Sequence, residues 1–365
     1  MWYNRTTGFW GYMFRLSLVG LVSFLLSGCF FTGVNPKYKG PDTRPLELDQ
    51  YYSRGESYSS AKEEIVQKTG DYQLKRITLE SQAGTITIDY FERYEKSGEL
   101  ILVFPLLGGR NTISDYFADY FAQGGFDCAI IHRINDFKSP ENFDRLEELL
   151  RKGVIRDRIA LDYFENVYAK KDFGTFGISR GGINVAISAG VDERLKYNVI
   201  AMGGADLPNL FRASGQPRLR KYVRTVTDTR NISVDEFYTL LNERIKTDPK
   251  YLSKYMDARN ALMFVSILDR SVPLKYGLKL RDSIGDPKTY YLFADHYAGI
   301  LYTRYVQLIP PVGPLGIFPM DFIETTALNF YKQSFKRGRR DIREGLLQIL
   351  QLPLNIIAAI SEKLF

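Results

Sequence analysis

Six short, almost uninterrupted apolar runs recur along the chain, and segments with helical patterns separate them. Such runs are typical of strands buried on both faces, because neither face carries a regular set of polar residues. The intervening segments, such as 113–125 and 141–170, carry apolar residues at helical spacing. Strands that alternate with helices predict an α/β fold, a mostly parallel sheet covered by helices on both faces. The runs are ELILVFP (99–105), DCAIIHR (127–133), FGTFGI (173–178), YNVIAMGG (197–204), ALMFVSIL (261–268) and TYYLFA (289–294).

The folded body is expected to begin near Asp71 with a different kind of strand. The segments YQLKRITLE (72–80) and TITIDYFERY (85–94) alternate apolar and polar residues around Ala83-Gly84. Alternation with a period of two indicates a strand with one buried face, and a glycine between two such segments favours a turn. The sequence therefore predicts an antiparallel hairpin in front of the parallel strands.

The amino terminus has the pattern of an export signal. Two arginines precede an apolar stretch, Leu16–Leu26, that is shorter than the roughly 20 residues needed to span a bilayer. The next residues, Leu26-Ser27-Gly28-Cys29, resemble the lipobox of bacterial lipoproteins. That resemblance implies a signal peptide over 1–28 and lipid on Cys29, which becomes the first mature residue. Met13 is an alternative start of the chain. The other interpretations of this segment are an exported protein in which the cysteine stands by chance, or an anchor that is not cleaved.

The lipoprotein resemblance also implies a location. Phe30 follows the cysteine where an aspartate would favour retention in the inner membrane, so the implied site is the periplasmic side of the outer membrane in a bacterial envelope. Residues 29–70 are rich in Pro, Gly, Ser and charge and are expected to form a tether. Once Cys29 carries lipid, Cys128 is the other cysteine of the mature chain, and its apolar surroundings predict a buried thiol.

A serine between two glycines stands where one predicted strand ends and a helix begins. Gly177-Ile178-Ser179-Arg180-Gly181 fits the pattern G-x-S-x-G, which in this context forms a nucleophile elbow. The glycines are needed because the serine lies on a strained turn, where a Cβ at the flanks would collide with the neighbouring strand or helix. Because this pattern also arises by chance, the assignment depends on its position between a predicted strand and a predicted helix.

An acid and a histidine follow the serine in a specific order. Asp269 comes after the run that ends at 268, and His296 comes after the last predicted strand. With these residues the chain resembles the α/β-hydrolases of the esterase, lipase and peptidase group over about residues 71–330. The acid loop D-x-x-V-P (269–273), the GDP turn (285–287) and the elbow GISRGG (177–182) support this resemblance.

The resemblance implies a role for each of the three residues. Ser179 would be the nucleophile, His296 would take its proton, and Asp269 would hold the imidazole in the required tautomer. Asp206, after the preceding strand, is the alternative acid, and Asp295 is expected to point elsewhere. The chain has two histidines, and His132 is expected to pack or to form hydrogen bonds rather than to react.

Two backbone amides are expected to stabilise the oxyanion. The N–H of Arg180 follows the nucleophile directly, and the second donor should come from the loop FPLLGGR (104–110), with Leu107 as the best candidate. Pro105 and Leu106 stand where the family commonly has His-Gly, so the position of this loop is the weaker part of the inference. Arg110 at the same loop is either solvated or binds an acidic group of the substrate.

Two segments outside the sheet bear on the choice of substrate. Residues 207–258 are too long for a simple connection and are expected to form a helical cap over the cleft. The cap is locally basic, and the carboxyl-terminal segment 341–365 is amphipathic, so it either lies on a membrane or packs on the body. For a lipidated, exported chain of net charge +7, anionic lipid or phosphate-bearing glycolipid is a more fitting partner than nucleic acid.

The sequence therefore predicts a membrane-tethered serine hydrolase of carboxylic esters, with a small-molecule ester or acyl compound as substrate. A peptidase or acyltransferase of the same fold is the first alternative, because esters and amides pass through the same tetrahedral oxyanion. An inert hydrolase-fold binding protein of the envelope is the second. The sequence contains no residue cluster with metal-ligand spacing and no phosphate-binding glycine loop, so we expect neither a metal nor another cofactor.

Overall fold

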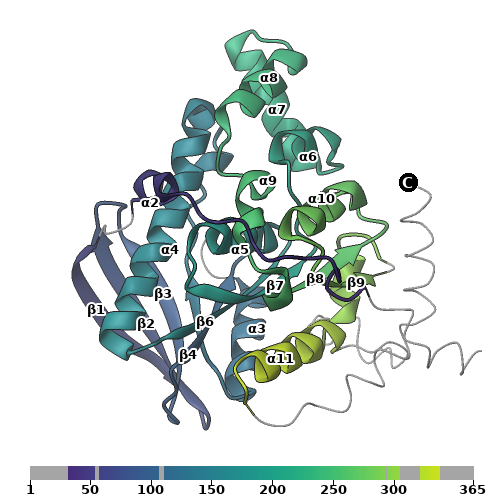
Figure 1. Cartoon of the computed structure of the whole chain (residues 1–365). Helices are drawn as coiled ribbons and strands as arrows, with labels where there is room; N and C mark the ends of the chain where they lie inside the picture. Colours follow the sequence, from purple (N-terminus) through teal and green to yellow (C-terminus); the bar gives the residue numbers. More distant parts are fainter. Residues whose placement is uncertain (1–31, 54–56, 107–110, 293, 305–320, 338–365) are drawn as a thin grey trace, which may run out of the picture.

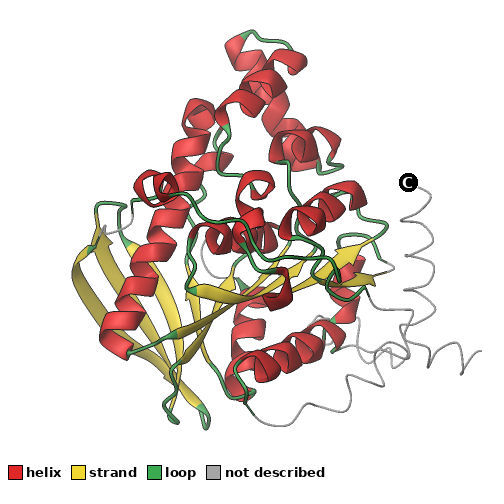
Figure 2. Cartoon of the chain, in the orientation of Figure 1, coloured by secondary structure: helices red, strands yellow, loops and turns green. Residues whose placement is uncertain are grey.

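Nine strands form one mixed sheet in the order β1-β2-β3-β5-β4-β6-β7-β8-β9 (Figures 1 and 2). The computed structural model describes residues 32–53, 57–106, 111–292, 294–304 and 321–337. The strands are β1 (Tyr58–Lys68), β2 (Tyr72–Ser81), β3 (Ile86–Arg93), β4 (Glu99–Phe104), β5 (Asp127–Ile131), β6 (Asp172–Ile178), β7 (Leu195–Ala201), β8 (Ala261–Ser266) and β9 (Lys288–Leu292). The strands from β4 onward pair in parallel, and β1, β2 and β3 pair antiparallel, with β3 joining β5.

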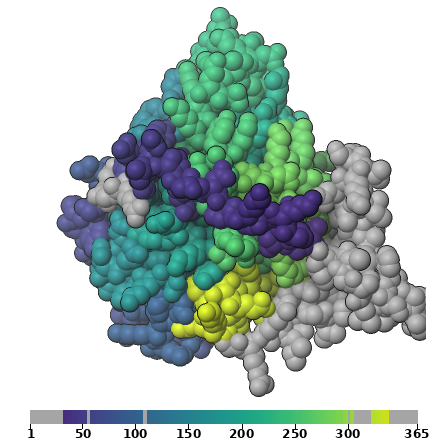
Figure 3. Space-filling model, viewed as in Figure 1, coloured from purple at the N-terminus to yellow at the C-terminus, as the bar shows by residue number. Residues whose placement is uncertain are grey.

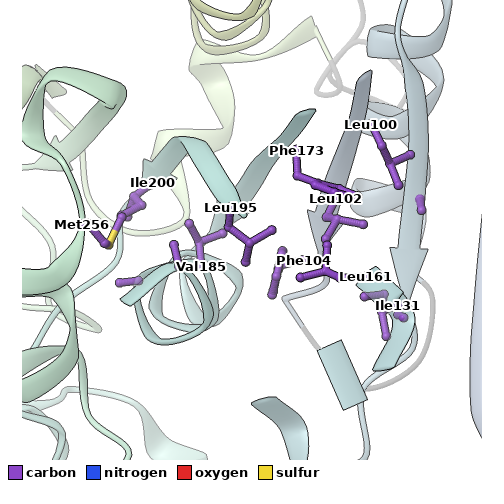
Figure 4. Close-up of a cluster of buried hydrophobic side chains, with 14 of the residues drawn as sticks. Leu100, Leu102, Phe104, Ile131, Leu161, Phe173, Val185, Leu195, Ile200 and Met256 are labelled. Carbon is purple, nitrogen blue, oxygen red and sulfur yellow. The ribbon is translucent and has the colours of Figure 1, made fainter. Parts of the chain in front are cut away.

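Helices cover both faces of this sheet, as predicted. On one face lie α4 (Leu146–Tyr168), α5 (Arg180–Val191) and α10 (Leu274–Ile284), and on the other lie α3 (Thr112–Gln123) and α11 (Phe322–Ser334). Strand β4 shows why its sequence is continuously apolar. Leu100, Leu102 and Phe104 belong to the first core, which Figure 4 shows, while Ile101 and Val103 belong to the second. Both faces are therefore buried, and no polar alternation remains.

The predicted hairpin is confirmed as β2 and β3. Ile77 pairs with Ile88 in the antiparallel register, and both side chains are fully buried. Gly84 adopts φ +82° in the turn, a conformation that favours glycine, and its N–H donates to the carbonyl of Ser81 at 2.9 Å. This hairpin adds antiparallel strands to the parallel part of the sheet.

The segment predicted as a tether over 29–70 includes one helix and one strand in its described parts. Residues 45–52 include α2 (Leu46–Tyr51), and residues 58–68 form the edge strand β1. Tyr52 is 1% exposed, and the Arg44 guanidinium donates to the carbonyls of Ala189 and Gly190. The purple segment in Figure 3 runs across the surface of the domain. Because β1 is exposed on nearly its whole length, its sequence carries charge on both faces and gives no strand periodicity.

The insertion expected over 207–258 consists of helices α6 (Leu207–Ala213), α7 (Pro217–Arg230), α8 (Val234–Arg244) and α9 (Pro249–Leu252). Figure 1 shows α7 and α8 projecting from the body of the domain. A small separate core holds them there, because Phe237 of α8 stacks on Phe143 at a centroid distance of 4.8 Å, together with Val226 of α7. The insertion is therefore a packed helical unit attached beside α4.

Several predicted segments lie outside the described residues. These are the signal peptide over 1–28, Cys29, the loop residues Leu107 and Arg110, and the carboxyl-terminal segment 341–365. Within the described ranges, no helix has both the length and the apolar composition needed to cross a bilayer.

Candidate active site

Ser179 lies on a strained turn between β6 and α5. Its backbone adopts φ 55° and ψ −121°, which is costly for a residue with a side chain. The neighbouring glycines show why the chain tolerates this turn. A Cβ on Gly177 would lie 2.3 Å from the carbonyl carbon of Gly181, and a Cβ on Gly181 would lie 2.3 Å from the carbonyl oxygen of Phe104. Both contacts are with backbone atoms, so no side-chain rotation would relieve them.

The structure brings Ser179, His296 and Asp269 together from three separate loops. Ser179 Oγ lies 2.7 Å from Nε2 of His296, and Nδ1 of His296 lies 2.6 Å from Oδ2 of Asp269. The side chains of His296 and Asp269 are 10% and 2% exposed. An Nδ1–H that donates to the carboxylate leaves Nε2 free to accept a proton from the serine hydroxyl.

The second oxygen of Asp269 fixes the orientation of the carboxylate. Oδ1 accepts hydrogen bonds from the backbone N–H groups of Ser271, at 2.7 Å, and Val272, at 2.8 Å. Because the acid is already held by its own loop, its Oδ2 faces His296 in a defined direction.

The two other aspartates considered from the sequence point elsewhere. Asp206 precedes α6, and its carboxylate forms ion pairs with Lys279 and Lys250. Burial alone would raise the pKa of this carboxyl, but these partners hold it below its usual range. Asp295 Oδ1 accepts from the backbone N–H groups of Tyr297 and Ala298, which orders the turn that carries His296. Neither carboxylate reaches the imidazole in this structure.

One of the two expected oxyanion donors can be placed. Arg180 is the first residue of α5, so its N–H belongs to the helix start and is adjacent to Ser179. The end of β4 approaches the same point, because Phe104 lies against Gly181. Leu107, the second expected donor, lies outside the described residues, so the structure gives no geometry for it.

The side chain of Arg180 was not singled out from the sequence. Its guanidinium stacks on the ring of Phe137 at 4.4 Å and donates to Asn135 Oδ1 at 3.3 Å and to the carbonyl of Ile134 at 3.5 Å. Burial, together with the charge of Arg133, lowers the pKa of Arg180 to about 10. The arginine after Ser179 therefore occupies a half-buried position with neutral hydrogen-bond partners.

The cap insertion contacts both loops of the serine-histidine-aspartate group, which the sequence did not indicate. Gln216, just before α7, donates from Nε2 to Ser271 Oγ at 2.8 Å and accepts from Tyr297 Oη at 3.2 Å. These two residues lie within two positions of Asp269 and His296. The N–H of Gly215 also donates to the carbonyl of Arg270 at 2.6 Å. The start of α7 is thus fixed against the site.

The remaining candidate residues have structural partners. His132 Nε2 lies 2.7 Å from Asp89 Oδ2, in agreement with the hydrogen-bonding role expected for it. Cys128 is fully buried, and burial raises the pKa of its thiol well above the usual value. Across the described part of the chain, no group of three or more His, Cys, Asp or Glu side chains could hold a metal ion.

Known structures share the arrangement of this domain. No protein-family model and no curated protein sequence matches the chain. Acetyl xylan esterase 1 from Thermoanaerobacterium sp. JW/SL YS485 superposes with a TM-score of 0.53 at 16% identity, over 71% of this chain and 91% of the esterase. An acetyl xylan esterase from Paenibacillus sp. R4 gives 0.53 at 16% identity, over 72% of this chain and 92% of its own.

A third structure with a different substrate in its name has the same fold. The 2,6-dihydroxy-pseudo-oxynicotine hydrolase superposes with a TM-score of 0.50 at 14% identity, over 73% of this chain and 70% of that chain. At these identities the likeness establishes the architecture and leaves the activity to be argued from the site. Strand order, helix layers and these neighbours together show that the chain has the α/β-hydrolase fold.

Proposed function

We propose that the protein is a serine hydrolase of carboxylic esters. The observation that carries the proposal is the pair of hydrogen-bond distances that join Ser179 to His296 and His296 to Asp269. A serine hydroxyl is a weak nucleophile by itself, and an imidazole within hydrogen-bond reach, oriented by a buried carboxylate, is the arrangement that activates it. The acetyl xylan esterases among the structural neighbours favour esters over other acyl compounds.

The reaction would proceed in two steps. Ser179 Oγ attacks the ester carbonyl while His296 Nε2 takes the hydroxyl proton, and the negative charge forms on the carbonyl oxygen beside the N–H of Arg180. The ester C–O bond then breaks, the imidazolium gives its proton to the departing alkoxide, the alcohol leaves, and the acyl group remains on Ser179 Oγ. Water, deprotonated by the same imidazole, attacks the acyl-serine, and the imidazolium returns the proton to Ser179 Oγ as the carboxylic acid is released. Asp269 keeps its charge throughout and stabilises the imidazolium.

We further propose that lipid on Cys29 tethers the enzyme to a bacterial membrane, on the periplasmic side of the outer membrane. The lipobox-like sequence supports the modification, and the first described residues set the length of the link. Thr32 pairs with Thr289 at the start of β9. Two residues, Phe30 and Phe31, separate this point from Cys29, and such a link spans only about 10 Å. Replacing Cys29 by serine should move the protein from the membrane to the soluble fraction and abolish labelling by radioactive palmitate.

The ester proposal is tested with a series of 4-nitrophenyl esters of increasing acyl length and with matched 4-nitroanilides. We expect the wild-type protein to hydrolyse esters, with an optimum length that defines the acyl pocket, and the Ser179→Ala protein to be inactive at equal concentration. Cleavage of anilides in preference to esters would instead support the peptidase alternative. Ester hydrolysis that persists in Ser179→Ala would contradict the proposed mechanism.

A further inference from the structure

One side chain of the cap joins the two loops that complete the serine-histidine-aspartate group. The loop after β8 carries Asp269, and the loop after β9 carries His296. Gln216 lies between these loops, because its Nε2 donates to Ser271 Oγ at 2.8 Å and its Oε1 accepts from Tyr297 Oη at 3.2 Å. The position of each loop is therefore tied to that of the other through the start of the cap.

The contact with Asp269 runs through a single peptide group. The Ser271 N–H donates to Asp269 Oδ1 at 2.7 Å. The carbonyl of the same peptide group belongs to Arg270 and accepts from the N–H of Gly215 at 2.6 Å. Because a peptide group is planar and rigid, a donor that holds its oxygen also fixes the direction of its N–H. The Ser271 carbonyl accepts from Ser214 Oγ at 2.8 Å, so the next peptide group is held as well.

The sequence at the start of the cap suits this contact rather than the helix that follows. Gln216 occupies the N-cap of α7, but its side chain forms no hydrogen bond with the helix start. Gly215 allows the close approach to the loop, since a Cβ there would lie 3.0 Å from the carbonyl oxygen of Arg270 and 3.3 Å from its Cβ. The side-chain amide of Gln216 thus serves the two loops of the body instead of capping α7.

Tyr297 extends the contact to His296. It follows the histidine directly in the chain, and the two rings stand edge to face with their centroids 5.8 Å apart. Because Tyr297 is 69% exposed, packing alone holds its ring only weakly. The hydrogen bond from its Oη to Gln216 therefore limits where the ring, and the backbone that it shares with His296, can lie.

We propose that Gln216 is a positioning residue, which holds the two loops together so that the Asp269 carboxylate faces Nδ1 of His296. This inference rests on the proposed function, because the geometry that it maintains is that of the hydrolytic reaction. Displacing a reacting group by about 1 Å can cost about 100-fold in rate, so a residue that fixes both loops affects turnover without contacting the substrate. It also follows that the cap cannot open at its start without disturbing the site.

Steady-state kinetics of Gln216→Met test the proposal, because methionine keeps the length of the side chain and removes both hydrogen bonds. We expect kcat on a 4-nitrophenyl ester to fall about tenfold or more, while KM changes by less than about twofold, since the loss concerns the transition state rather than binding. An unchanged kcat, or a loss that appears only in KM, would overturn the proposal.

Ser233→Ala is the matched control in the neighbouring cap helix. Ser233 is the N-cap of α8, and its Oγ accepts from the N–H of Glu236 at 3.1 Å, so the variant weakens the cap away from the two loops. We expect lower thermal stability with an unchanged kcat. Equal losses of kcat in Ser233→Ala and Gln216→Met would show that the stability of the cap decides the rate, and would overturn the positioning role.

Tyr297→Phe tests the second contact at an exposed position, where folding is not at risk if Gln216→Met folds poorly. It keeps the ring and removes one hydroxyl donor, so we expect kcat to fall about threefold. The double variant should be no slower than Gln216→Met alone, because both changes break the same hydrogen bond. Losses that multiply in the double variant would show that the two side chains act independently, contrary to the proposal.

A magnetic resonance signal tests the same geometry without any substrate. The chain has two histidines, so isotope-labelled histidine in the full-length protein gives few ring N–H signals, and Asp269→Asn identifies that of His296 Nδ1. A proton held between Nδ1 and a buried carboxylate forms a short, charge-assisted hydrogen bond and resonates far downfield. We expect this signal in the wild-type protein and in Ser233→Ala, and its upfield shift or broadening in Gln216→Met.

The two readouts separate this inference from the proposed function. If the wild-type protein hydrolyses no ester, the proposed function fails, while a changed His296 signal in Gln216→Met still supports the positioning role. If the protein hydrolyses esters in a Ser179-dependent way, and Gln216→Met keeps both the wild-type kcat and the wild-type signal, the positioning role alone is overturned.

Discussion

His296 Nε2 lies 2.7 Å from the hydroxyl oxygen of Ser179, although 117 positions separate the two residues in the chain. The serine stands at the end of a strand in the middle of the sheet, and the histidine follows the last strand at its edge. The parallel pairing of β6, β7, β8 and β9 brings their carboxyl ends to one side of the sheet, and this topology closes the distance.

The acid role is expected to belong to Asp269. Asp269→Asn should lower kcat by about 10³- to 10⁴-fold, because the amide can no longer hold the imidazole in the tautomer that accepts the serine proton. Steady-state kinetics on a 4-nitrophenyl ester measure the loss. Asp206→Asn is the control and should retain kcat while unfolding at lower denaturant, since it weakens the ion pairs with Lys279 and Lys250. Reversal of these two outcomes would transfer the acid role to Asp206.

The elbow should not accept a side chain at Gly181. A methyl group there would lie 2.3 Å from the Phe104 carbonyl oxygen, so the backbone of β4 or α5 must shift, and we expect loss of activity together with reduced stability. Gly153→Ala in α4 is the matched control, because its Cβ would meet only Arg133 at 3.9 Å and alanine favours a helix. Thermal unfolding and ester hydrolysis of both variants check this expectation, which an active and stable Gly181→Ala protein would contradict.

The amino-terminal segment is expected to contribute to stability rather than to act as a flexible link. Tyr52→Ala should cost about 3–5 kcal/mol of unfolding free energy, because it empties a fully buried position and removes the hydrogen bond to Thr247 Oγ1. Leu46→Ala in α2, at a side chain that is 78% exposed, should change stability by less than about 0.5 kcal/mol. Urea unfolding of the two variants compares them, and equal stabilities would support the tether predicted from the sequence.

Because of Glu324, the free energy of unfolding of the protein is expected to fall as the pH rises. Burial among the helices raises its pKa to about 8, from an ordinary value of 4.5, and its Oε1 accepts from the backbone N–H of Arg304 and from Tyr116. A carboxyl whose pKa is raised in the folded state contributes most to the free energy of unfolding below about pH 4.5. That contribution falls by up to about 1.4 kcal/mol per pH unit between about pH 4.5 and 8. Glu324→Gln removes this titration.

The stability of Glu324→Gln relative to the wild-type protein should therefore increase steadily from pH 5 to pH 8 and then level off. Urea unfolding at pH 5, 6.5, 8 and 9 measures the difference. A difference that stays constant over this range would show that Glu324 does not titrate in it.

The strands, the elbow and the two partners of Ser179 could be predicted from the sequence because each leaves a local pattern. Buried parallel strands are continuously apolar, the elbow needs its glycines, and an acid and a histidine after consecutive strands have few alternatives in a chain with two histidines. The edge strand β1 left no such pattern, since nearly all its side chains stay exposed and its charged residues are typical of a solvated link.

The contacts of Arg180 and Gln216 could not be predicted for a different reason. Arg180 contacts Asn135 and Phe137 in the segment after β5, and Gln216 contacts Ser271 and Tyr297, so both sets of contacts depend on how segments far apart in the chain pack together. The sequence shows a basic insertion, but pairs of charges within it, such as Arg230 with Asp144, form only in three dimensions. A composition count therefore cannot separate a neutralised arginine from one without a counter-charge.

The most direct test of the central claim is labelling of the full-length protein, in membranes, with a fluorophosphonate probe beside its Ser179→Ala form. The probe reacts only with a serine whose hydroxyl is activated by a neighbouring base. The account predicts covalent labelling of the wild-type protein at Ser179, and none in the variant at equal folded concentration. Absence of labelling in a folded wild-type protein, or equal labelling of both proteins, would contradict it.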